Sequence, residues 1–196
     1  MSSNLPFGSS EVAGWAARAG LVYEPFPDES WFRNWEPYDT ITPPARYLSS
    51  CTWFAARGHV VLVEPWYAND DLPPLDRTLL AFAVHAGFGA RASARAGEHF
   101  LTRVAFLESP PPPKITLGDA VWDANVSTFA RTAQEGAAAF HPRVRKLLVG
   151  WGFQGHLEMR PGGMVLHCAG VPPTAAGYER LLGIVNAVVD KAVNPR

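Results

Sequence analysis

Apolar and polar residues alternate most regularly in the last third of the chain, from Gly118 to Val193. Apolar residues alternate with polar ones over residues 156–160, and the alternation returns over residues 164–168 after Pro161-Gly162-Gly163. Successive side chains of a strand point to opposite faces, so a turn at these residues places both apolar sets on one face. The pattern predicts a β-hairpin with Met159, Leu166 and Cys168 in the core.

A long amphipathic helix is predicted after Pro172-Pro173, from the N-cap Thr174 to Val193. Its apolar residues recur at helical spacing and form a broad stripe. They are Tyr178, Leu181, Leu182, Ile184, Val185, Val188 and Val189. Gly183 within this helix costs about 1 kcal/mol relative to alanine, and we therefore expect it to allow close packing on the sheet.

A shorter helix is predicted near the start of the chain, with Ser10 as N-cap and Gly20 as its end. Val12, Trp15, Ala16 and Ala19 recur at helical spacing. They give this helix one narrow apolar face, which we expect to lie on the body of the domain.

Strands dominate the next part of the chain. Residues 46–56 and 59–67 are rich in β-branched and aromatic residues, and they predict a hairpin in which Gly58 supplies a positive φ. Residues 78–85 and 100–107 are further strand candidates. The connection from Gly87 to Gly97 between them fits either a weak strand or a loop.

The region before the C-terminal hairpin predicts a strand over Asp119 to Ala130, followed by two helical segments. The first covers residues 133–140, and the second begins at His141-Pro142, since proline suits the first helical turn. In the second segment, Arg143, Arg145 and Lys146 lie opposite the apolar residues. We interpret these cations as a solvated helix face.

Together these elements predict an α+β fold: an antiparallel sheet built from hairpins, packed by an N-terminal helix, a middle helical segment and a long C-terminal helix. A chain of 196 residues can bury one sizeable core. We therefore predict a single domain over residues 1–196. The four prolines Pro110–Pro113 form a stiff connector at which this domain could be subdivided.

Composition narrows the class of protein. The chain has 17 basic and 18 acidic residues, a formal net charge of −1, which argues against a nucleic-acid partner. Its apolar runs are too short to span a bilayer, and its first residues do not form a secretory signal. With only Cys51 and Cys168, it has no disulfide framework, and we expect a cytoplasmic location.

No catalytic motif stands out: the sequence has no phosphate-binding loop, nucleophile elbow, paired-histidine zinc helix or redox cysteine pair. His156, Glu158 and His167 are expected to share the outer face of the C-terminal hairpin, where such residues could bind zinc but are usually solvated. Cys51 falls inside a strand, an unfavourable place for a reactive thiolate. We predict no catalytic residue, no metal and no cofactor.

The candidate binding residues lie in an aromatic, proline-rich stretch, at Trp31, Phe32, Trp35 and Tyr38, together with Arg46. Aromatic side chains and arginine are favoured at binding hot spots. They also pack loops onto a protein body, so this stretch is either a packed loop or an aromatic groove for a ligand or a partner.

The order of motifs in the last third also suggests a family. It runs through Gly118-Asp-Ala-Val-Trp-Asp-Ala-Asn-Val126, Arg145-Lys-Leu-Leu148, Gly155-His-Leu-Glu-Met159, Gly163-Met-Val-Leu-His167 and the closing helix. This order resembles bacterial proteins of unknown function of the DUF3137 type, in which an aromatic-Asp pair, here Trp122-Asp123, precedes a strand. The resemblance implies the fold, and it implies no activity, cofactor or catalytic residue. This sequence lacks the membrane segments that many members carry.

Two functions remain open. The first is a non-enzymatic interaction, accessory or scaffold protein of the bacterial cytoplasm, which contacts a protein partner through the aromatic loop or a sheet edge and could form homo-oligomers. The alternative is a small-molecule-binding protein or enzyme with a pocket between the sheet and the C-terminal helix, using Arg46 and His85 or His167.

Overall fold

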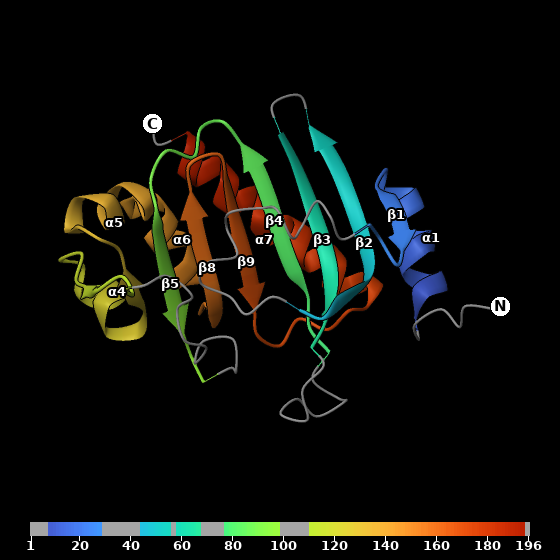
Figure 1. Cartoon of the computed structure of the whole chain (residues 1–196), viewed down its shortest axis with the longest axis horizontal. Helices are drawn as coiled ribbons and strands as arrows, with labels where there is room; N and C mark the ends of the chain where they lie inside the picture. The colour runs from blue at the N-terminus through green and yellow to red at the C-terminus, as the bar shows by residue number, and fades with distance from the viewer. Residues whose placement is uncertain (1–7, 29–43, 56–57, 68–76, 99–109, 195–196) are drawn as a thin grey trace.

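A computed structural model describes residues 8–28, 44–55, 58–67, 77–98 and 110–194. In this part of the chain, nine strands form one antiparallel sheet in the order β1-β2-β3-β4-β9-β8-β5-β7-β6 (Figure 1). The strands are β1 (Val22–Pro25), β2 (Arg46–Ala55), β3 (Gly58–Trp66), β4 (Leu80–His85), β5 (Ala92–Ala96), β6 (Lys114–Ile115), β7 (Ser127–Phe129), β8 (Gly155–Arg160) and β9 (Gly163–Cys168).

The described helices are α1 (Ser9–Ala19), α4 (Ala120–Asn125), α5 (Ala133–Ala139), α6 (Pro142–Gly150) and α7 (Ala175–Val193). Helix α7 crosses one face of the sheet, α1 lies at the β1 end, and α4 to α6 lie at the other end (Figure 1). The predicted α+β class, with its antiparallel sheet and its N-terminal, middle and long C-terminal helices, is confirmed. None of the helices described is long and apolar enough to cross a membrane.

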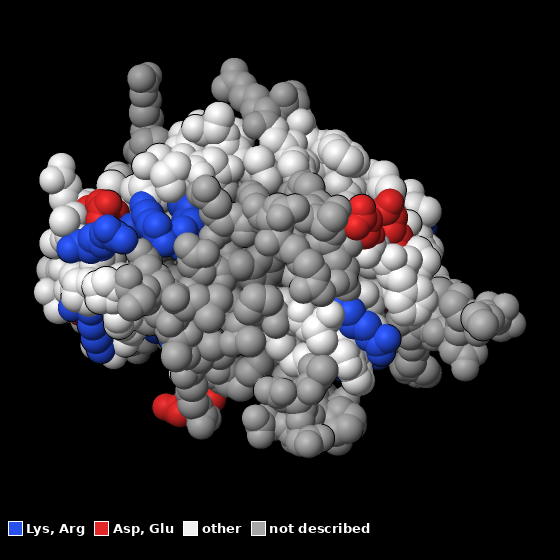
Figure 2. Space-filling view, in the orientation of Figure 1, with Lys and Arg blue, Asp and Glu red and all other residues white. Residues whose placement is uncertain are grey.

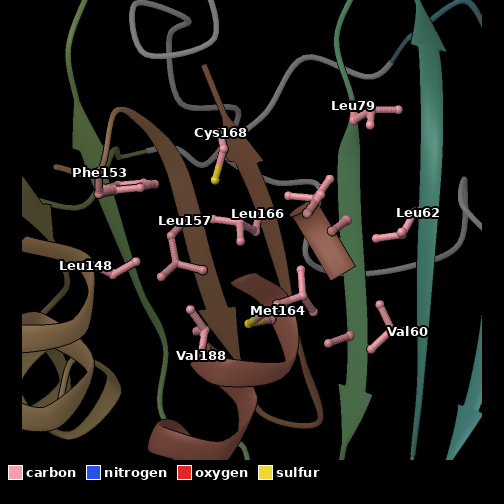
Figure 3. Packing of buried hydrophobic residues seen from close by; sticks show 14 of the residues in the cluster. Val60, Leu62, Leu79, Leu148, Phe153, Leu157, Met164, Leu166, Cys168 and Val188 are labelled. Atoms are coloured by element: carbon pink, nitrogen blue, oxygen red, sulfur yellow. The ribbon is translucent and has the colours of Figure 1, made fainter. Parts of the chain in front are cut away.

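The main hydrophobic core lies between the sheet and α7. Leu62, Leu157 and Leu166 come from the strands and Val188 comes from α7 (Figure 3). All four are buried at 0% exposure, and burying one such side chain stabilises the fold by about 1.5–3 kcal/mol.

The C-terminal hairpin forms as predicted. Leu157 of β8 lies opposite Leu166 of β9, and Cys168 is buried. The predicted N-cap of α7 is also confirmed, because the Thr174 side chain accepts a hydrogen bond of 3.2 Å from the Gly177 backbone N–H. The hairpin occupies the centre of the sheet, with β9 beside β4 and β8 beside β5.

Gly58 has a different role from the predicted one. It lies in β3 opposite His85 of β4, and it is not among the residues with positive φ. A Cβ atom at this position would lie 2.0 Å from the Val84 carbonyl oxygen. The glycine is therefore required by the close approach of two strands.

Helix α1 ends at Gly20, which has a φ of 73°, as predicted. Its start is different, because the N-cap is Gly8 and Ser10 is already inside the helix. Of the four positions predicted for the apolar face, Val12, Trp15 and Ala16 are buried, whereas Ala19 at the end of the helix is exposed.

The predicted strand over Asp119 to Ala130 is wrong in its first half, which forms helix α4 before strand β7. The Asp119 side chain accepts a hydrogen bond from the Trp122 backbone N–H at 3.2 Å and caps this helix. The Trp122 indole then donates to the Thr128 hydroxyl at 2.8 Å and ties α4 to β7. This capping outweighs the strand preference of Val121 and Trp122.

The Gly87 to Gly97 connection contains strand β5, all of whose residues are buried. Alanine and serine are small enough for a strand that packs on both faces. The strand predicted over residues 100–107 lies outside the described residues.

Candidate functional site

The polar residues of the C-terminal hairpin lie on the face of the sheet opposite α7, as their alternation predicts. The prediction that they are solvated is wrong: His156, Glu158 and His167 are exposed by only 0%, 1% and 0%. The Glu158 carboxylate pairs with the Arg160 guanidinium, and His167 Nε2 lies 2.9 Å from the Thr78 hydroxyl. We call these five residues the buried polar row.

Burial sets the charge of His156 in this row. The pKa of His156 lies well below its usual value, first because burial disfavours the imidazolium, then because Arg95 and His167 lie nearby. His156 is therefore neutral at pH 7, and its Nε2 lies 3.8 Å from the Glu158 carboxylate. Within the described residues, no group of three histidine, cysteine or carboxylate side chains could hold a metal ion.

The two cysteine thiols are buried hydrophobes. Cys51 is 0% exposed and Cys168 is 8% exposed. Burial raises the pKa of each thiol to about 12, so both are neutral at pH 7. Because thiolates are the nucleophilic form, the structure agrees with the interpretation of Cys168 as a core residue and of Cys51 as an unreactive strand residue.

The cations of α6 do not all behave as predicted. Arg143 and Lys146 are exposed. Arg145 is buried, and its guanidinium donates to the Asp119 carboxylate and to the Phe140 carbonyl, each at 3.0 Å. This arginine joins α6 to the start of α4, a contact between distant segments that helical periodicity does not reveal.

The predicted binding residues Trp31, Phe32, Trp35 and Tyr38 lie outside the described residues. Arg46 is described: it is the exposed first residue of β2, and its guanidinium carbon lies 5.5 Å from the ring centroid of Trp66. This distance is typical of a cation–π contact.

A pocket of about 380 Å³ lies between α7 and the end of the sheet. It is lined by Trp151, Gly152, Phe153, Gln154, Cys168, Ala169, Val171, Arg180, Gly183 and Ile184. Its volume falls within the usual range of small-molecule sites. We call it the α7 pocket. The predicted ligand residues Arg46, His85 and His167 do not line it.

Gly183 lines the α7 pocket and is exposed, so the prediction that it allows close packing on the sheet is wrong. A Cβ atom built on Gly183 would meet no heavy atom within 4 Å. By contrast, a Cβ atom on Gly177 of the same helix would lie 1.9 Å from the Pro172 carbonyl oxygen. A glycine in the middle of an amphipathic helix was therefore the feature of the sequence that could have indicated the pocket. It was interpreted instead as a position of close packing.

A second concave surface lies at the β1 end, on the face opposite α7. It is a groove of about 360 Å³ whose lining includes Phe54, His59 and the acidic residues Glu24 and Asp28. Phe54 is 68% exposed and Val22 of β1 is 50% exposed. Figure 2 shows acidic side chains at this end of the molecule. We call these five residues the β1-end surface.

Comparison with known proteins yields a structural likeness. No family model matches the chain, and no curated protein matches its sequence. The chain is similar in structure to the crystal structure of the mycobacterial trehalose monomycolate transport factor A, TtfA, with a TM-score of 0.63 and 11% sequence identity. The similarity covers 93% of this chain and 92% of TtfA. At this identity, the likeness concerns the fold alone.

Proposed function

We propose that this chain is a non-enzymatic accessory protein that contacts a protein partner through the β1-end surface. The observation that carries the proposal is the concentration of exposed apolar side chains there: Val22 at 50% and Phe54 at 68%. Exposed apolar surface beside a groove and rimmed by charge is typical of interaction sites. The acidic rim of Glu24 and Asp28 favours a partner segment with apolar and basic side chains.

The β1-end surface also refines the predicted sheet-edge contact. Strand β1 is an edge strand of four residues that ends at Pro25, which has no backbone N–H. Short edge strands with proline resist pairing with another strand. We therefore place the contact on the face beside the edge, rather than in an added strand.

The structural likeness supports an accessory role, since TtfA is described as a transport factor. The proposal includes a bacterial cytoplasmic location, where the thiols of Cys51 and Cys168 would stay reduced. Membership of the DUF3137-type proteins remains part of this proposal and rests on the motif order of the last third. Self-association of the chain is also part of this proposal.

Site-specific photo-crosslinking in cells tests the partner surface. A photoreactive amino acid at Phe54 is expected to crosslink one predominant protein, because this side chain is the most exposed large apolar one of the surface. The matched control is Val121 of α4, at the opposite end of the sheet and 57% exposed. Charge reversal with Glu24→Lys and Asp28→Lys should reduce the crosslink at Phe54.

The same crosslinked proteins at Phe54 and Val121 would contradict the proposal, because a specific surface cannot be matched by an unrelated exposed residue. An undiminished crosslink in the charge-reversed variant would contradict the basic character assigned to the partner. A crosslink to a second copy of this chain would identify the partner as a homo-oligomer.

A second candidate function is favoured by the α7 pocket. Its volume of about 380 Å³ corresponds to roughly a dozen water molecules, well above the few-water cavities common in protein interiors. Phe153 and Val171 give it a buried apolar floor. We therefore propose small-molecule binding in this pocket as the alternative role, tested by the titrations described below.

A further inference from the structure

A second hollow, a basic groove, lies next to the α7 pocket and shares the lining residue Trp151 with it. The groove, about 540 Å³, is lined by Arg143, Lys146, Leu147, Gly150, Trp151 and Lys191. Trp151 lines both hollows, and its side chain is 44% exposed. An indole at the boundary between an apolar pocket and a charged groove suits a ligand that has both characters.

The apolar half of this composite site has a buried apolar floor, and Gln154 and Arg180 are also part of its lining. Phe153, Cys168 and Val171 are exposed by 7%, 8% and 2%, and Ile184 is partly buried against the same core. Since Gly183 contributes no side chain, the space above this floor remains open. An alkyl chain gains affinity from such a surface in proportion to the apolar area it buries.

The polar half carries an excess of positive charge. Arg143, Lys146 and Lys191 line the groove, and Asp190 pairs with Lys191 at 2.6 Å. The pKa of Asp190 is lowered chiefly by the Lys191 hydrogen bond, then by Asn194, so its carboxylate is charged at pH 7. Three cations against one carboxylate favour an anionic group.

The spacing along α7 places the lining residues of the two hollows on one side of the helix. The lining residues that α7 contributes are separated by three, one and seven positions in sequence, which places them on one side of the helix. They are Arg180, Gly183, Ile184 and Lys191. From Arg180 to Lys191 the helix rises by about 16 Å. An extended single chain can therefore follow this side of α7 from the pocket into the groove.

We propose that this site binds a single-chain amphiphile with an anionic head group, with the alkyl chain in the α7 pocket and the head group in the basic groove. This inference rests on the second candidate function and adds the chemical class of the ligand. Arg180, which also lines the pocket, would flank the chain at its other end.

Dodecyl phosphate, kept below its critical micelle concentration, is the probe. We expect its titration into the ¹⁵N-labelled full chain to shift the amide resonances of Gly152 and Gly183, and to leave those of α1 unchanged. Gly183→Leu should weaken binding by about tenfold or more, because each methylene displaced from the pocket loses roughly a factor of four. Leucine is a better helix former than glycine, so this variant should keep its fold.

Gly14→Leu is the matched control for Gly183→Leu. Gly14 also lies inside a helix, and a Cβ atom there would meet only the end of the Arg18 side chain, at 3.4 Å. This variant changes the same residue type in α1, far from the pocket. Its affinity for dodecyl phosphate should equal that of the unchanged protein.

The head group is tested with a neutral analogue. Dodecyl maltoside should bind about five- to tenfold more weakly than dodecyl phosphate, as expected from the loss of two partly exposed charge contacts. The double variant Arg143→Gln, Lys146→Gln should reduce this preference and its dependence on salt, since Lys191 is then the one cation left among the residues that line the groove.

Four results would overturn the proposal, and they are distinguishable. Equal binding of the maltoside and the phosphate would reject the anionic class and leave the pocket function standing. If neither amphiphile binds, both the anionic ligand class and the binding function of the pocket are rejected. Unchanged affinity in Gly183→Leu would show that the chain lies elsewhere. Shifts of the Gly183 resonance by inorganic phosphate alone, at the same concentrations, would reject the amphiphile in favour of a simple anion.

Discussion

Two neighbouring residues of β8 show how the two faces of the sheet differ. Leu157 and Glu158 are equally buried, at 0% and 1% exposure. Leu157 packs into the core beneath α7, whereas Glu158 pairs with Arg160 on the opposite face. Burial is thus compatible with charge when the charge is paired, because an unpaired buried ion would lose its hydration without compensation.

The same contrast extends along the strands. On the α7 side, the central strands contribute side chains such as Leu62 and Leu166 to one apolar cluster. On the other side, Phe82 and Val165 form a smaller apolar cluster, and the buried polar row lies on the same face. One face is therefore held mainly by the hydrophobic effect, and the other by a mixture of apolar contacts and paired polar groups.

The largest expected effect comes from removing one partner of the buried ion pair. Glu158→Leu should lower the free energy of unfolding by about 3–5 kcal/mol, because it leaves the Arg160 guanidinium buried without its carboxylate. The double variant Glu158→Leu, Arg160→Met should recover part of this loss, since an apolar pair can replace a buried ion pair, whereas the buried Arg95 still loses its attraction to Glu158. Urea denaturation measures both values, and a double variant no more stable than the single one would contradict this view of the face.

A smaller effect is expected from pH. Burial holds the folded-state pKa of His156 well below its usual value, while in the unfolded chain the pKa returns to about 6.5. Below pH 6.5 the unfolded state therefore binds a proton that the folded state excludes, and stability falls with decreasing pH. From pH 7 to pH 5 the loss should reach about 2 kcal/mol for this group.

Denaturation at several pH values checks the contribution of His156. His156→Gln should flatten the dependence between pH 7 and pH 5, whereas Leu157→Ala should keep it, because that variant is destabilised without losing a titrating group. An unchanged slope in His156→Gln would mean that this histidine is not the excluded protonation site.

The smallest expected effect is the difference in stability between two single substitutions, one on each face of the sheet. Thr128→Val leaves the Trp122 indole N–H unpaired in the core, which should cost about 1–3 kcal/mol. Thr78→Val removes the hydroxyl that contacts the equally buried His167, so the same range of about 1–3 kcal/mol applies. Thermal unfolding can rank the two variants. A larger loss of stability for Thr78→Val would show that a single hydrogen bond contributes more in the buried polar row than in the apolar core.

Sequence patterns predicted the parts of the fold in which local and tertiary preferences agree. The β8–β9 hairpin and α7 were predicted because alternation, turn residues and the Thr174 cap all indicate the same elements. The buried polar row was predicted on the correct face with the wrong environment. Alternation shows which residues share a face, and it cannot show whether that face is covered.

The candidate sites were less predictable, because they depend on contacts between distant segments. Arg145 was assigned to a solvated face, yet it binds Asp119, 26 residues away in sequence. The α7 pocket combines residues from α7 with the segments flanking β8 and β9, a juxtaposition without a local pattern. In the sequence, only Gly183 indicated this pocket, because it lacks a side chain within an otherwise apolar helix.

The position of the C-terminal hairpin has a consequence for biosynthesis. Strands β4 and β5 follow each other in the chain, yet β8 and β9 separate them in the sheet. Until residues 155–168 leave the ribosome, at a synthesis rate of about 5–20 residues per second, the edges of β4 and β5 lack their central partners. The nascent chain therefore exposes the edges of β4 and β5, which attract other strands, until β8 and β9 close the sheet from within.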